Sequence, residues 1–187
     1  MSSTPQTAIQ NSSDRPLWQI KPSARRDYYS SAPAMIIDAS KRYRATIRTQ
    51  RGDIVLELDA VSAPQHTNNF VFLARQGFYD GITFHRVEPD FVIQGGDPLG
   101  DGSGGPGYLI PAEFDLPHHQ GVIAMARKGD QVNPERKSSG SQFYITLKPT
   151  PFLDGQYSVF GRVIQGFDVV QQITRGDVML RVDIEER

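Results

Sequence analysis

The chain has 187 residues, enough for one domain with a substantial core, and its 38% hydrophobic and 22% charged residues are typical of a soluble globular protein. A formal net charge of −1 provides no basic surface for nucleic acid or an anionic membrane, so we expect neither as a partner. The absence of cysteine excludes disulfides, thiolate metal sites and thiol nucleophiles.

The N-terminal sequence shows neither a signal-peptide pattern nor the hydrophobic pattern of a folded domain. Residues 1–40 are rich in Ser, Pro, Gln and Ala and lack a hydrophobic period. We therefore expect a flexible or loosely docked arm here, with the folded domain over residues 41–187. Trp18 and the pair Tyr28–Tyr29 could anchor parts of the arm. Because no apolar run approaches the ~20 residues of a membrane helix and no signal-peptide pattern is present, we expect a cytoplasmic protein.

The first elements of the domain are predicted to be a β-hairpin and a helix. Residues 42–49 and 53–60 alternate apolar and polar side chains on either side of a turn at residues 50–52. The helix that follows has an apolar face with i, i+3, i+4 spacing, formed by Phe70, Leu73 and Ala74. Its ends are indicated by Ser62 as N-cap, Pro64 in the first turn and Gly77 as the C-terminal stop.

The stretch FHRVEPDFVIQGGD (84–97) favours strand but carries two polar groups within an apolar run. Arg86 and Gln94 stand where hydrophobic residues would also fit, and Pro89 divides the stretch. Either both are satisfied surface groups, or they line a wet site on the wall of a sheet. The next segment, GDGSGGPG (100–107), contains G-x-G-x-x-G, but no helix follows it, so we expect a tight loop and no phosphate site.

The rest of the chain is predicted to be mostly strand. The strand patterns lie at residues 121–126, 141–147, 158–164 and 178–186. A second helix is expected over residues 166–176, where Phe167, Val170 and Ile173 recur at helical spacing before Gly176. This succession indicates an antiparallel barrel or sandwich with helices outside, without choosing between them.

Hydrolytic and metal chemistry have little support in the sequence. The four histidines, His66, His85, His118 and His119, show no metal-ligand spacing with a third ligand nearby. We expect His118 and His119 to be a solvated loop pair, and His85 to be structural. Ser141 follows Gly140, but G-x-S-x-G is absent, so acyl transfer is not indicated.

Five separated motifs, in order, resemble those of the cyclophilin-type peptidyl-prolyl cis–trans isomerases, in their microbial single-domain form, from about residue 45 to 185. They are FHRVEPDFVIQGGD, GDGSGGPG, MAR at 125–127, SGSQFYI at 139–145 and FLDGQYSVFGRV at 152–163. The resemblance implies a mainly β fold, a closed eight-stranded antiparallel β-barrel capped by two α-helices. It also implies an enzyme that accelerates rotation about Xaa-Pro bonds of proline-containing polypeptides and assists protein folding, with no metal or cofactor.

The resemblance further implies a groove on the outer wall of the barrel. Its catalytic residues would be Arg86, Gln94 and Phe91. Its substrate-binding residues would be Val92, Ala126, Arg127, Gln142, Tyr144, Phe152, Leu153 and Tyr157. Arg86 would donate hydrogen bonds to the twisted transition state, with Gln94 positioning it, and the backbone of residues 126–127 would pair with the substrate as an added strand. A strict two-residue period puts Phe91 opposite Val92 and Gln94, so their convergence on one groove is implied by the resemblance alone.

Several positions depart from the family pattern or keep a second interpretation. Phe152 replaces a tryptophan and lacks its N–H donor, so we expect weak cyclosporin binding. Tyr157 stands at a histidine position and is either a site residue or a rim aromatic. The segment 127–138 has four basic residues. It is either a solvated loop or a loop that biases the enzyme toward acidic peptides. Arg86 could be a surface ion-pair partner and Gln142 a structural support. The alternative to an enzyme is a non-catalytic proline-peptide-binding or chaperone-like module, and we expect a monomer.

Overall fold

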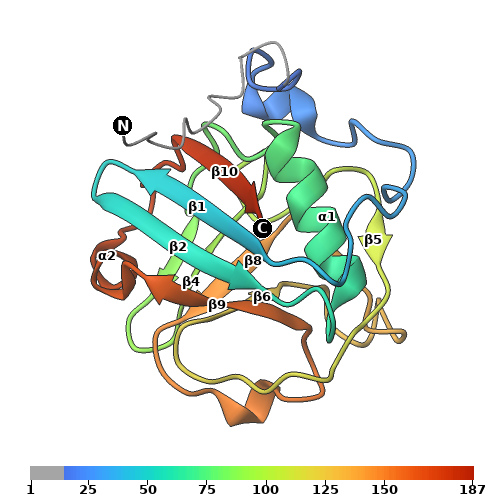
Figure 1. The fold of residues 1–187 in the computed structure, drawn as a ribbon, viewed down its shortest axis with the longest axis vertical. Helices are drawn as coiled ribbons and strands as arrows, with labels where there is room; N and C mark the ends of the chain where they lie inside the picture. The colour runs from blue at the N-terminus through green and yellow to red at the C-terminus, as the bar shows by residue number, and fades with distance from the viewer. Residues whose placement is uncertain (1–14) are drawn as a thin grey trace, which may run out of the picture.

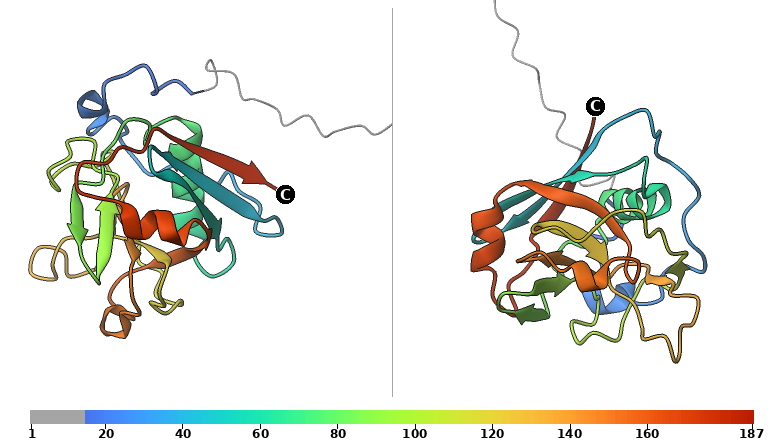
Figure 2. Two further views of the ribbon diagram at one scale, coloured as in Figure 1. Left: turned by 90° about the vertical axis from the view of Figure 1, so that its left-hand side faces the viewer. Right: turned by 90° about the horizontal axis from the view of Figure 1, so that it is seen from below.

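The computed structural model describes residues 15–187, which form a strongly curled antiparallel sheet with helices α1 and α2 on opposite sides of it (Figures 1 and 2). The eight strands follow the order β10-β1-β2-β9-β6-β8-β4-β3. Their bounds are β1 Tyr43–Thr49, β2 Gly52–Leu58, β3 Arg86–Glu88, β4 Val92–Gly95, β6 Val122–Met125, β8 Phe143–Thr146, β9 Val159–Gln165 and β10 Arg181–Glu186. A separate two-stranded ribbon, which the sequence did not predict, joins β5 (Leu109–Ile110) to β7 (Ser138–Ser139).

The sheet is an open half-barrel, so the prediction of a closed barrel is wrong. Among the described strands, the terminal pair β10 and β3 do not hydrogen-bond to each other, and a single isolated bridge joins Thr83 to Val178 across the seam. Positive φ angles at Gly81 (83°) and Gly176 (94°) turn the backbone beside this bridge and interrupt regular pairing. The rest of the fold prediction, a mainly β protein with eight antiparallel strands and two α-helices, is confirmed.

Two hairpins form where the residue pattern predicts strands. In the first, β1 pairs with β2 from Tyr43 opposite Leu58 to Thr49 opposite Gly52, and the inward-facing side chains are buried. In the second, β3 pairs with β4 so that Arg86 lies directly opposite Gln94. Directly opposite residues in an antiparallel pair share one face of the sheet, so this register alone brings the two polar side chains together.

Helix α1 (Pro64–Arg75) packs its apolar side into the core, as predicted. Its N-cap is Ala63 and not the predicted Ser62, which lies in the turn before the helix, where the Asp59 carboxylate accepts its backbone N–H (2.8 Å). Gly77, with φ 76°, ends the helix as predicted. The N–H of Gly77 and that of the next residue close back on carbonyls of the last turn in a Schellman arrangement.

Helix α2 (Phe167–Gln172) is shorter than the predicted 166–176. The backbone becomes extended at Ile173, with φ −59° and ψ 133°, and the Asp177 carboxylate accepts the N–H of Thr174 (2.8 Å) in the following turn. Within residues 15–187, neither helix has the length and apolarity that a bilayer span requires.

Residues 15–40 pass around the outer side of α1 before entering β1 (Figure 1). Two arginines of this segment are almost completely buried. Arg15 forms an ion pair with Asp80 (2.6 Å), and Arg25 donates to three backbone carbonyls. Leu17 is also fully buried, whereas Trp18 and Tyr28 are about half exposed. Residues 1–14 of the expected arm lie outside the described residues, and the boundary at residue 40 stays a prediction.

Candidate active site

Nine of the eleven predicted site residues line one cavity of about 220 Å³. They are Arg86, Phe91, Val92, Gln94, Ala126, Arg127, Tyr144, Leu153 and Tyr157. Strands β3, β4 and β8 supply the residues of one wall, and the loops after β6 and around the short 3-10 helix Pro151–Leu153 supply the others. The structure therefore brings together side chains that are spread over 72 positions of sequence, from residue 86 to residue 157.

The cavity lies on the face of the sheet opposite the main core, and strands β4 and β8 carry apolar side chains on both of these faces. In β4, Ile93 belongs to the main core, whereas Val92 belongs to a second apolar cluster. In β8 the same alternation puts Ile145 in the core and Tyr144 in the second cluster. Successive side chains of a strand point to opposite faces, so an apolar run with no polar alternation can serve a core and a pocket at once.

Phe91 reaches this outer cluster because it is not part of a strand. It lies in the turn between β3 and β4, next to Asp90, whose φ is 61°. The two-residue period that would place it opposite Val92 therefore does not apply, and its side chain packs with the second cluster. The ring lies 5.9 Å from the Phe152 ring and 5.9 Å from the Arg86 guanidinium carbon.

The Arg86 guanidinium is held at the cavity mouth by two partners. Its Nε and Nη2 donate to the Glu88 carboxylate (3.0 and 2.6 Å), and its Nη1 donates to Gln94 Oε1 (3.0 Å). A guanidinium has five N–H groups, so two remain available to a ligand. Glu88 was not among the predicted site residues, although it lies two residues from Arg86 on the same face of β3 and could have been found by that spacing.

A chain of hydrogen-bonded side-chain amides links Arg86 to the Gly-rich loop. Gln94 Nε2 donates to Gln142 Oε1 (3.2 Å), and Gln142 Nε2 donates to the carbonyls of Gly102 (2.9 Å) and Gly104 (2.8 Å). Both glutamines are buried. Gln142 does not line the cavity of about 220 Å³. It lines an adjoining cavity of about 480 Å³, which also borders the Gly-rich loop.

His118 is buried beneath the cavity, so its prediction as a solvated loop residue is wrong. Its Nε2 lies 2.8 Å from the Tyr144 hydroxyl, and its Nδ1 lies 3.0 Å from the Asp154 carboxylate. A tautomer with the proton on Nδ1 satisfies both contacts, donating to Asp154 and accepting from Tyr144. Burial raises the pKa of Tyr144 and lowers the pKa of His118, which keeps both groups neutral near pH 7. No sequence spacing connects His118 to residue 144, so the pattern gave no signal for this contact.

We expect the free energy of unfolding to fall as the pH is lowered below about 6.5, where histidine titrates in an unfolded chain. Burial lowers the pKa of His118 in the folded state, and burial likewise lowers that of His85. A group with a lower pKa when folded binds protons preferentially in the unfolded chain, so stability is present at higher pH and is lost as the pH falls through this window. Urea denaturation between about pH 8 and about pH 5 measures the slope.

A His118→Gln variant isolates the contribution of this residue from that of His85. It should be less stable than the wild type at about pH 8, because it loses the bonds to Tyr144 and Asp154, but its stability should depend less steeply on pH between about 6.5 and 5. An unchanged slope would contradict the assignment of this pH dependence to His118.

The loop after β6 presents backbone groups beside the cavity. The N–H of Ala126 donates to the Gln142 carbonyl (2.9 Å), and the Ala126 carbonyl accepts from Ser139 (2.8 Å). Within residues 15–187, the Arg127 backbone N–H and carbonyl have no such partner. The substrate was predicted to pair with the backbone of residues 126–127, and only the two backbone groups of Arg127 are free for that pairing. The Arg127 side chain covers the Tyr157 ring at 4.6 Å and bonds to the Gln156 carbonyl.

The basic side chains of residues 127–138 are largely paired within the loop itself. Arg127 and Arg136 both contact the Asp130 carboxylate (2.7 and 3.0 Å), and Lys137 contacts Glu135 (2.6 Å). Pairing of this kind reduces the field that the loop presents to a ligand. The bias toward acidic peptides therefore stays a prediction, with a smaller expected effect than four open charges would have.

The remaining histidines and acidic residues do not form a metal site. Among residues 15–187, no group of three His, Cys, Asp or Glu side chains is arranged to hold a metal ion. His66, in α1, is buried and bonds to Glu113 (2.5 Å) and Ser138 (2.8 Å). These contacts give it a structural role.

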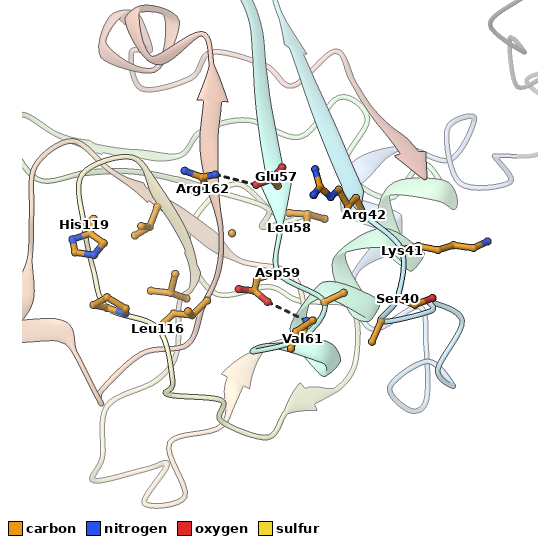
Figure 3. A pocket seen from close by; sticks show the side chains of 16 residues that line it. Ser40, Lys41, Arg42, Glu57, Leu58, Asp59, Val61, Leu116, His119 and Arg162 are labelled. Atoms are coloured by element: carbon orange, nitrogen blue, oxygen red, sulfur yellow. Dashed lines mark hydrogen bonds and ion pairs between the residues drawn. The ribbon is translucent and has the colours of Figure 1, made fainter. Parts of the chain in front are cut away.

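A larger cavity, of about 780 Å³, lies between the segment before β1 and the loop before β6 (Figure 3). It contains none of the predicted site residues. Arg162 pairs with Glu57 on the neighbouring strand (3.1 Å), and the Asp59 carboxylate accepts the backbone N–H of Val61 (3.0 Å), so three of its charged groups already have partners (Figure 3). We therefore assign the site to the smaller cavity that Arg86 borders.

Comparison with known proteins identifies the family of the chain. Residues 44–186 match the sequence family described as cyclophilin type peptidyl-prolyl cis-trans isomerase/CLD. The chain is 43% identical over 147 residues to a peptidyl-prolyl cis-trans isomerase of Helicobacter pylori, covering 76% of this chain and 86% of that protein. It is 44% identical over 135 residues to peptidyl-prolyl cis-trans isomerase B of Bacillus subtilis, covering 71% of this chain and 90% of that protein.

A solved structure shares the fold. The crystal structure of a cyclophilin type peptidyl-prolyl cis-trans isomerase from Cryptosporidium parvum superimposes with a TM-score of 0.71 at 30% identity, covering 78% of this chain and 99% of that one. The family match extends over more than half of the chain, and the relatives exceed 40% identity over most of their own length. The chain therefore belongs to the cyclophilin-type peptidyl-prolyl cis–trans isomerases, a family of enzymes.

Proposed function

We propose that Arg86 accelerates the rotation of Xaa-Pro bonds by stabilising the twisted transition state without a covalent intermediate. Amide resonance sets a barrier of roughly 18–20 kcal/mol to this rotation. At the twisted geometry the resonance is lost, the proline nitrogen becomes pyramidal and basic, and charge on the carbonyl oxygen changes. A fixed cation with free N–H donors stabilises this arrangement more than either planar form, which is the requirement for catalysis.

The observation that carries this proposal is the fixed Arg86 guanidinium at the mouth of an apolar cavity. Its contacts with Glu88 and Gln94 hold it in place and leave two N–H groups for the substrate. Phe91, Val92, Tyr144 and Leu153 line the cavity beside it and would hold the proline ring. Because the guanidinium is already oriented in the free protein, little reorganisation is needed when the bond twists.

We further propose proline-containing polypeptides as substrates. The Cryptosporidium parvum relative has been crystallised in the presence of the dipeptide Ala-Pro, at 29% identity to this chain and a TM-score of 0.69. Uncatalysed prolyl isomerisation takes tens to hundreds of seconds and limits the folding of many chains, so an isomerase of this kind would assist protein folding. The expected cytoplasmic location and monomeric state stay predictions.

Exchange spectroscopy by NMR on a short Ala-Pro-Phe peptide tests the proposal. The wild-type protein should accelerate exchange between the cis and trans peptide resonances at catalytic concentrations. Chemical-shift changes in the peptide without faster exchange would instead support the non-catalytic proline-peptide-binding or chaperone-like module. Neither acceleration nor shift changes would contradict both functions.

Cyclosporin is expected to inhibit this enzyme only weakly. Phe152 does not line the cavity: it is 67% exposed, its ring lies 5.9 Å from the ring of Phe91, and it offers no N–H donor where the family pattern has tryptophan. Loss of one hydrogen bond to a bound ligand weakens affinity by roughly 0.5–1.5 kcal/mol, or about two- to tenfold. A Phe152→Trp variant should therefore bind cyclosporin more tightly than the wild type in a calorimetric titration. Equal affinities would show that residue 152 does not set the sensitivity.

A further inference from the structure

The Gly-rich loop, residues 100–107, is held at both of its ends. At its start the Asp97 carboxylate, which is buried, accepts three backbone N–H groups, those of Leu99 (2.8 Å), Asp101 (3.0 Å) and Gly102 (2.6 Å). At its end the loop bonds to a segment that lies outside the family match of residues 44–186. The N–H of Asp27 donates to the Gly105 carbonyl (3.0 Å), and the N–H of Tyr29 donates to the Pro106 carbonyl (2.9 Å).

The contact between this segment and the loop is specific in its geometry. Gly107 has a φ of 111°, and a Cβ placed there would collide with the carbonyl oxygen of Tyr29. Asp27 adopts a left-handed φ of 51°, which non-glycine residues adopt rarely and at some energetic cost. The Tyr29 ring packs edge-on against Phe72 of α1 (5.3 Å) and against Tyr108 (6.3 Å), which fixes the segment to the domain.

The loop held in this way carries the acceptors on which the amide chain depends. The Gly102 and Gly104 carbonyls receive Gln142 Nε2, so the plane of the Gln142 amide is fixed by the position of the loop. That plane directs Oε1 to Gln94, whose own Oε1 receives Arg86. A loop so rich in glycine has little conformational preference of its own, so its position depends on what holds its ends.

We propose that residues 25–29 are a positioning element of the active site, which fixes Arg86 through the Gly-rich loop, Gln142 and Gln94. Arg25 anchors the segment to the turn that follows α1, and Tyr29 and Asp27 hold the loop. The inference rests on the proposed function in one respect, since it takes Arg86 as the catalytic group. Asp27 also lines the cavity of about 480 Å³ next to the prolyl site, so the segment borders the groove that it orders.

Three variants of the full-length chain test this role. Tyr29→Ala removes the ring that fixes the segment to Phe72 and Tyr108. Tyr29→Phe keeps the ring and loses only a hydroxyl that is buried without a partner among the described residues. Leu17→Ala is the matched control, because Leu17 is fully buried in the same N-terminal segment but hydrogen-bonds to Gln76 at the end of α1, away from the Gly-rich loop.

We expect Tyr29→Ala to lower kcat about three- to tenfold with a smaller change in KM, because it loosens a transition-state donor and leaves the apolar cavity intact. Hydrogen exchange of the Gln142 side-chain amide, followed by NMR, should become faster in the same variant. Tyr29→Phe should keep the wild-type kcat and the slow exchange of the Gln142 amide. Leu17→Ala should lose thermal stability and keep both the wild-type kcat and the slow amide exchange.

Two results would overturn the proposal. One is a Tyr29→Ala variant with wild-type kcat and unchanged Gln142 amide exchange. The other is a Leu17→Ala variant that loses kcat to the same extent, since this would trace the effect to general loosening of the N-terminal segment. If the wild type itself does not accelerate exchange, the proposed function fails, and the Gln142 amide exchange alone decides for or against the positioning of the loop.

Discussion

Replacement of Arg86 by alanine is expected to lower kcat/KM for a short Xaa-Pro peptide about 10²–10³-fold, the range observed when one preorganised donor to a developing charge is removed. The side chain is 45% exposed and bonds to Glu88 and Gln94 at the cavity mouth, so the fold should be unchanged. If Arg86 acts only in the transition state, kcat should fall and KM should change little. Peptide exchange spectroscopy measures kcat and KM, and circular dichroism checks that the variant is folded.

Two further variants separate the chemistry of Arg86 from its charge. Arg86→Lys keeps the positive charge but loses the planar fork that contacts Glu88 and Gln94 together, so it should recover only part of the activity. Arg162→Ala is the matched control, a 68% exposed arginine that also pairs with a glutamate but lies at the other cavity. It should retain wild-type activity. An Arg86→Ala variant with more than half of the wild-type kcat/KM would exclude the proposed mechanism.

The two polar residues in the apolar run are the part of the site that the sequence predicts from local rules. Arg86 and Gln94 occupy facing positions of a hairpin whose strands and turn follow from residue types, and the register then puts both on one face. The identity of the other cavity residues came from the resemblance to a family. Residue types alone could not show that Tyr144 and Leu153 lie beside Arg86, because that proximity depends on the order of strands in the sheet.

The features that the sequence did not predict are contacts between distant segments. His118 is buried because a loop folds beneath Tyr144, and the open seam of the sheet depends on how residues 81–84 meet residues 176–179. The β5–β7 ribbon pairs two residues with two others that lie 28 and 30 positions away, and a two-residue strand is too short to recognise by alternation. Composition likewise does not reveal that Arg25, within the arm expected over residues 1–40, is buried by bonding to carbonyls.

Replacement of Arg25 by alanine is expected to lower the free energy of unfolding by about 2–4 kcal/mol, measured by urea denaturation. Arg25 is 2% exposed, and its guanidinium donates to the carbonyls of Ile20 (2.6 Å), Phe78 (2.8 Å) and Asp80 (2.5 Å). Without the side chain these carbonyls lose their donors and a cavity remains, and both effects disfavour the folded state. Arg25→Lys keeps a positive charge and three N–H donors in a different geometry, so its free energy of unfolding should fall by less than that of Arg25→Ala.

The neighbouring residue provides the matched control for this prediction. Arg26 is 56% exposed and pairs with Asp27 at the surface (3.2 Å), so Arg26→Ala should change the free energy of unfolding by less than about 1 kcal/mol. A large difference between the two variants would mean that residues 15–29 unfold together with the domain, and that the folding unit begins well before residue 41. Equal, small effects would mean that the segment detaches before the domain unfolds. The family match begins at residue 44, so this pair of adjacent arginines distinguishes the extent of the family from the extent of the cooperative fold.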